Sequence, residues 1–73
     1  MKAYKVVMTN MAPALHGQET FGGNYNDFDE LATAQSFAEE EKVKWQWVSV
    51  FKRTKEGTLD KIRYYQNNKE CPV

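Results

Sequence analysis

The side chains best suited to chemistry gather between residues 45 and 65, where large aromatic rings are interspersed with cations. Aromatic rings bury much surface at a small entropic cost, and together with arginine they dominate the hot spots of protein interfaces. The same mixture suits nucleic acid, because bases stack on rings and cations meet phosphates. The pattern therefore predicts a partner-binding surface, and its candidate residues are Trp45, Trp47, Phe51, Lys61, Arg63 and Tyr65.

Side chains that could act as nucleophiles or metal ligands are too few to predict catalysis. His16 is the one histidine and Cys71 the one cysteine, whereas zinc takes three or four such ligands. A Cys–His pair also needs a third group that orients the base, and none is apparent. The Gly22-Gly23 pair lacks the further glycine and the Lys-Ser/Thr of a phosphate loop. We therefore expect no enzymatic activity, no cofactor and no metal.

Size and composition predict one small globular domain spanning residues 1–73. Aromatic residues make up 14% of the chain and charged residues 27%, a mixture that argues against disorder. No apolar run approaches the roughly 20 residues of a membrane span. The first residues carry no apolar segment typical of a secretory signal. With one cysteine and no such signal, the expected location is the cytoplasm.

The net charge of zero conceals a separation of charge along the chain. Residues 1–41 carry two lysines against seven acidic residues, and residues 42–73 carry eight basic residues against three acidic ones. Such an asymmetry indicates that the two halves present surfaces of opposite sign.

The first half of the chain predicts a strand, a long loop and a helix. Residues 2–9 alternate apolar and polar side chains, which is typical of a strand. Residues 10–26 are rich in glycine and polar residues and are expected to form a loop. Asp27 is expected to cap the helix, with Glu30 three residues later completing a capping box. The helix then places its small and apolar side chains on one face, namely Leu31, Ala34 and Ala38.

The second half predicts a β-hairpin followed by a polar tail over residues 67–73. A strand over 44–54 is joined to a strand over 59–66 by a three-residue loop with Gly57 in a left-handed conformation. In that register Thr54 pairs with Thr58 and Lys52 lies opposite Asp60.

Continued along the hairpin, the same register sets Val50 against Ile62 and Val48 against Tyr64. The helix would cover this face. The opposite face would then present Trp47, Arg63, Tyr65 and the other candidate residues to a partner. An alternative is that one or two of these rings belong to the core, or that loop 10–23 covers part of the face.

The fold class predicted from these elements is α+β. We expect a three-stranded, mainly antiparallel sheet with one amphipathic helix packed on one face, in the order β-α-β-β.

One stretch of the sequence resembles a known class of protein. An acidic helix start at Asp27 is followed by Leu31-Ala32-x-Ala34-x-x-Phe37-Ala38-Glu39 and then by Lys44-Trp45-Gln46-Trp47-Val48. This order is similar to that of small accessory proteins of bacteriophages and prophages, many of which have a strand–helix–strand–strand order. The resemblance implies a host-directed binding protein, such as an inhibitor of host transcription, of a nuclease or of an antiviral defence complex. It carries over no functional residues.

Two functions of different classes follow from the sequence. The leading hypothesis is a non-enzymatic protein-binding module, an inhibitor or modulator of a larger host protein complex that acts by occlusion. The alternative is a small nucleic-acid-binding domain that uses the basic and aromatic hairpin face, although the neutral net charge speaks against it. A homodimer joined through the same face is compatible with either.

Overall fold

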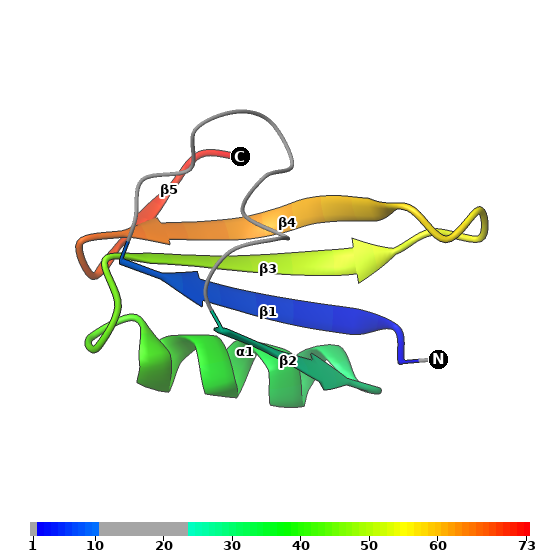
Figure 1. The fold of residues 1–73 in the computed structure, drawn as a ribbon, viewed down its shortest axis with the longest axis horizontal. Helices are drawn as coiled ribbons and strands as arrows, with labels where there is room; N and C mark the ends of the chain where they lie inside the picture. Colours follow the sequence, from blue (N-terminus) through cyan, green and yellow to red (C-terminus); the bar gives the residue numbers. More distant parts are fainter. Residues whose placement is uncertain (1, 11–23) are drawn as a thin grey trace.

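The computed structural model describes residues 2–10 and 24–73. These residues form one antiparallel sheet in the order β2-β1-β3-β4-β5, with a single helix packed against one face (Figure 1). In chain order the elements are β1 (Tyr4–Thr9), β2 (Asn24–Phe28), α1 (Leu31–Glu41), β3 (Trp47–Arg53), β4 (Leu59–Gln66) and β5 (Lys69–Cys71). The helix lies along the β2 side of the sheet, over β1, β2 and β3, and β4 and β5 form the other side (Figure 1).

The predicted three-stranded sheet is wrong, because the described residues form five strands. The first extra strand is β2, which lies within the segment that was expected to be loop. Its sequence, Asn-Tyr-Asn-Asp-Phe, has no alternating apolar pattern because three of its five residues are exposed at the edge of the sheet. Pairing with β1, from Tyr4 opposite Phe28 to Met8 opposite Asn24, defines it as a strand.

The second extra strand is β5, which lies within the expected polar tail. Asn67 and Asn68 both have positive φ, 53° and 68°, which is the backbone of the tight two-residue hairpin turn that asparagine tolerates well. The chain therefore reverses, and Gln66 pairs with Lys69.

The helix begins later than predicted, because Asp27 and Phe28 pair with Lys5 and Tyr4 in the sheet. Glu30 precedes the first helical residue with an extended backbone, and no side chain caps the helix there. The expected capping box is therefore not formed, and pairing in the sheet prevails over the local helix signal.

The core lies between the helix and the sheet, where Ala34 and Ala38 are fully buried. Their small side chains allow the helix to approach the strands closely. The Phe28 and Phe37 rings join β2 to the helix with centroids 5.2 Å apart. The buried cluster consists of Val6, Met8, Ala34, Ala38, Val48, Val50 and Tyr65.

The turn of the β3–β4 hairpin confirms the sequence prediction. Gly57 has a φ of 90°, Lys52 pairs with Asp60, and the amide of Thr54 donates to the carbonyl of Thr58 at 2.8 Å. Beyond the turn, however, the register shifts between Val50 and Phe51.

This irregularity places one extra residue in β4, so that every later pair moves by one position. Val50 pairs with Arg63 instead of Ile62, and Val48 pairs with Tyr65 instead of Tyr64. Because a shift of one residue turns side chains to the other face, Arg63 and Tyr65 lie on the helix side of the sheet.

The face of the sheet opposite the helix is not bare. Val7, Ser49 and Phe51 belong to this face, and each is at most 3% exposed. Whether loop 10–23 covers this face concerns residues 11–23, which lie outside the described residues, as does His16. Among the described residues, no helix is long and apolar enough to cross a membrane.

Candidate functional site: a groove between β2 and α1

The six candidate residues predicted from the sequence do not share one surface. Phe51 and Lys61 pair on the face opposite the helix, and Trp47 lies on the same face by alternation with Val48. Arg63 and Tyr65 lie on the helix face, and Trp45 precedes β3 and packs against the core cluster. The predicted hairpin face is therefore divided between the two sides of the sheet.

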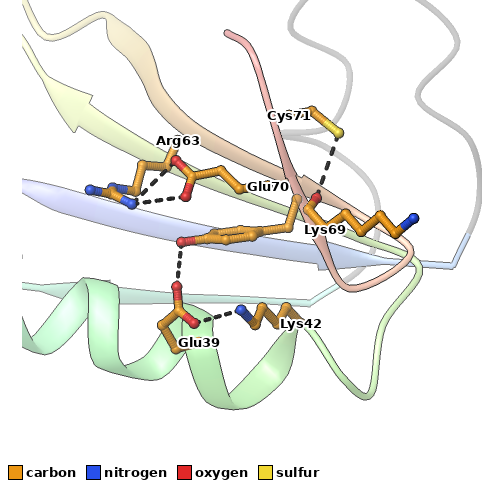
Figure 2. Close-up of polar contacts among 7 residues, drawn as sticks. Glu39, Lys42, Arg63, Lys69, Glu70 and Cys71 are labelled. Carbon is orange, nitrogen blue, oxygen red and sulfur yellow. Dashed lines mark hydrogen bonds and ion pairs between the residues drawn. The ribbon is translucent and has the colours of Figure 1, made fainter.

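Tyr65 is a core residue, because only 1% of its surface is exposed. Its hydroxyl donates a hydrogen bond of 2.8 Å to Glu39 on the helix, and Glu39 forms an ion pair of 2.6 Å with Lys42. Figure 2 shows both helix side chains in this chain of polar contacts. Burial raises the pKa of Tyr65, and the hydrogen bond to Glu39 adds to this effect. These contacts attach the helix to β4, so the role of Tyr65 is structural.

The other hairpin residues are also engaged within the protein. Arg63 Nη1 lies 3.2 Å from both carboxylate oxygens of Glu70 on β5 (Figure 2). Lys61 Nζ lies 4.5 Å from the centroid of the Tyr64 ring and 5.9 Å from that of Phe51. Phe51 is only 3% exposed. These contacts stabilise the sheet.

A groove of about 530 Å³ opens instead at the other side of the sheet, between β2 and the C-terminal half of α1. Its residues come from four parts of the fold: β1, β2, the helix and the segment before β3. We call it the β2 groove, and define it by Met8, Asn24, Tyr25, Asn26, Phe37, Glu41 and Trp45. Met8 is buried, whereas the three β2 residues are exposed. The groove therefore combines an apolar interior with a polar and aromatic rim.

The Trp45 wall of the groove is held in place by Glu41. The indole Nε1 donates a hydrogen bond of 3.0 Å to Glu41 Oε1, and the Trp45 amide donates to the Glu41 carbonyl at 3.1 Å. Lys44 Nζ lies 3.3 Å from the second carboxylate oxygen of Glu41. Because one hydrogen bond fixes the ring and the other fixes the backbone, Trp45 loses little further freedom when a partner contacts it, which is the advantage of a preorganised site.

Tyr25 borders the groove from the edge strand, but it pairs with Val7, so its ring lies on the face of the sheet opposite the helix. The residue is 55% exposed, and Lys5 Nζ lies 4.2 Å from the centroid of its ring. Large rings exposed beside an apolar groove are typical of binding surfaces rather than of a closed monomer surface.

The outer edge of β2, beyond which no described strand lies, runs along the same groove. The Arg53 amide donates to the Ala3 carbonyl, so by alternation Lys5 and Val7 direct their backbone groups toward β3. Tyr4, Val6 and Met8 then direct theirs toward Phe28, Asn26 and Asn24 on β2. The backbone N–H and C=O groups of Tyr25 and Asp27 consequently point away from β1, toward the outer edge.

The segment that forms this edge and the helix is acidic, although Lys5 of β1 and Lys44 lie beside it. Residues 24–41, which form β2 and α1, include six acidic residues and no lysine or arginine. Residues 47–71, which form β3, β4 and β5, carry six basic and three acidic residues. The charge separation along the sequence therefore becomes a separation across the sheet, from an acidic β2–α1 side to a more basic β4–β5 side.

Sequence reasoning missed the groove because it assigned β2 to a loop. The described residues contain no group of three or more acidic, histidine or cysteine side chains that could hold a metal. Cys71 is a free thiol whose Sγ lies 3.5 Å from the Lys69 carbonyl oxygen. Comparison with known proteins adds no assignment, since no family model, curated protein or solved structure matches this chain.

Proposed function

We propose that this chain is a non-enzymatic protein-binding module whose contact surface is the β2 groove. Its action is occlusion: by covering a site on a larger host protein or complex, it inhibits or modulates that partner in the manner of a phage-type inhibitor. The observation that carries the proposal is that three features meet at β2: the groove on its helix side, the exposed Tyr25 ring on its other face, and an outer edge beyond which no described strand lies.

The groove suits a protein segment better than a small molecule. It is open, and its rim consists of side chains from an edge strand and a helix. Enclosed pockets bury most of a small ligand, whereas an open groove beside a strand edge accommodates a chain that continues at both ends. A phosphate-rich ligand is disfavoured here, because residues 24–41 carry six acidic residues and no lysine or arginine.

The test is affinity capture from a nuclease-treated bacterial lysate with three versions of the tagged chain. The wild type should retain a partner protein, and Tyr25→Ala should lose it, since truncating an interface aromatic at a hot spot costs about 2 kcal/mol, or roughly thirtyfold in affinity. Val43→Ser is the matched control. Val43 is 65% exposed and does not line the β2 groove; it borders a second hollow of about 250 Å³ that lies on the other side of Trp45, the one residue shared by the two linings.

Each outcome decides one aspect of the proposal. A partner that is retained by the wild type and by Val43→Ser, but not by Tyr25→Ala, supports the β2 groove. Equal retention by all three versions would exclude the groove as the contact surface. Loss of every partner on nuclease treatment, or on raising the salt from about 50 to about 200 mM, would favour the nucleic-acid alternative.

A further inference from the structure

We infer that the partner contributes an extended, basic segment, which adds to the outer edge of β2 as a further antiparallel strand. This inference rests on the proposed function, because it names the chemistry of the partner that the β2 groove receives. Three independent features of the edge support it: the direction of its backbone groups, the groove at its side and its charge.

The backbone of β2 offers a template for pairing. Tyr25 and Asp27 direct their N–H and C=O groups away from β1, as derived above from the register. An incoming strand can pair with both residues, which gives affinity independent of its side chains. Natural proteins protect such edges with lysine, proline or a covering segment. The five residues of β2 include neither lysine nor proline, and no described strand lies beyond it.

The groove determines what alternate side chains of the incoming strand meet. Successive side chains of a strand point to opposite faces of the sheet. On the helix face, an incoming side chain lies over the β2 groove, against Phe37 and Trp45. That position favours apolar side chains, so the segment should alternate apolar residues with residues of another kind.

The charge of the edge indicates that the residues alternating with the apolar ones on the incoming strand are basic. The acidic residues Asp29, Glu30 and Glu40 are exposed around β2 and α1. Asp27 lies in the strand itself, and its Oδ1 is buried without a hydrogen-bond partner among the described residues. A lysine or arginine on the incoming strand is attracted by the exposed carboxylates of Asp29, Glu30 and Glu40.

The same charges argue against a second copy of this chain as the occupant. Pairing β2 with β2 would bring two acidic edges together, and like charges at short range oppose association. A basic segment of another protein gains from the same field. The occupant is therefore a cationic strand of another protein, and the experiment below distinguishes it from self-association.

The experiment uses two synthetic peptides and the full isotope-labelled chain. One peptide alternates arginine with valine, and the other alternates glutamate with valine. In NMR titrations, the basic peptide should shift the amide signals of Tyr25 and Asp27 and the indole signal of Trp45. The acidic peptide should leave these signals unchanged. Equal binding of both peptides, no binding of the basic one, or shifts confined to β4 and β5 would overturn the inference.

Two pairs of variants test the backbone and the charge separately. Tyr25→Ala and Tyr25→Pro both lose the ring, but only proline loses the outward N–H, so Tyr25→Pro should bind the basic peptide about fivefold more weakly than Tyr25→Ala. The doubly neutralised D29N/E40Q variant should also lose roughly fivefold. The control E56Q/D60N, which removes the same charge from the β3–β4 hairpin, should bind like the wild type.

These results are distinguishable from those of the lysate capture. Suppose that Tyr25→Ala weakens capture of the partner. If D29N/E40Q then captures as much partner as the wild type, and Tyr25→Pro as much as Tyr25→Ala, the groove binds a protein and the basic-strand inference is wrong. If capture is indifferent to Tyr25→Ala, the proposed function fails whatever the peptides do. Concentration-dependent line broadening without peptide would identify a second copy as the occupant and overturn the inference.

Discussion

Glu39 links the helix to the core through two different partners. It accepts a hydrogen bond from the buried Tyr65 hydroxyl and pairs with Lys42 one turn along the helix. Contact with Lys42 first, and then with Tyr65, lowers the pKa of Glu39 below its ordinary value of 4.5. The same ion pair raises the pKa of Lys42. One carboxylate therefore orients a core tyrosine and the last turn of the helix together.

The pKa shift of Glu39 predicts how stability depends on pH. Because the folded-state pKa is lower than the unfolded one, the stabilisation is present above pH 4.5 and is lost as pH falls through the folded-state pKa. We expect the wild type to lose more unfolding free energy than Glu39→Gln when urea unfolding is compared from about pH 5 downward. The two curves should converge in acid. Parallel curves would show that Glu39 contributes no pH-dependent stability.

The sequence singled out Tyr65 as a candidate contact residue, but it did not predict that the residue belongs to the core. The register predicted for β3 and β4 was regular, because no local residue preference indicates the shift between Val50 and Phe51. One extra residue exchanged the roles of Tyr64 and Tyr65 and moved Arg63 to the helix face. Arg63 and Tyr65 were therefore assigned to the wrong face, whereas Trp47, Phe51 and Lys61 lie on the face opposite the helix, as predicted.

At the scale of elements, the β4–β5 hairpin depends on two residues with unusual backbone angles. Asn67 and Asn68 both adopt positive φ, a conformation that costs most L-residues about 1–2 kcal/mol and asparagine or glycine less. Asn68→Ala should therefore lower the free energy of unfolding by about 1 kcal/mol, whereas Asn68→Gly should preserve it. Thermal unfolding of the three proteins checks this. Equal melting temperatures for alanine and glycine would contradict it.

The accuracy of prediction differs between elements for a physical reason. β1, β3, β4 and the helix bury apolar residues, so the spacing of those residues indicated them, and the Gly57 turn has a clear local signal. β2 and β5 are edge strands with mostly exposed side chains. Their pairing comes from the neighbouring strand and from turn geometry. The candidate site was missed with β2, because the groove exists only when this strand lies beside the helix.

At the scale of the whole molecule, charge distinguishes the two edges of the sheet. The β2–α1 side is acidic and the β4–β5 side more basic. We expect the acidic β2 edges of two copies to repel, and β5, with three residues, offers little length for head-to-tail pairing. Sedimentation equilibrium should therefore show a monomer at low salt. A dimer under these conditions would contradict this expectation and favour the homodimer alternative.

Binding of a partner at the β2 groove can be located most directly by hydrogen–deuterium exchange. The exchange of backbone amides is compared between the free chain and its complex with the captured protein. An added strand forms hydrogen bonds with the outward amides of Tyr25 and Asp27, so these two amides should exchange much more slowly in the complex. The amides of β4 and β5 should be unchanged. Protection confined to β4 and β5, with Tyr25 and Asp27 exchanging as in the free chain, would contradict the central claim.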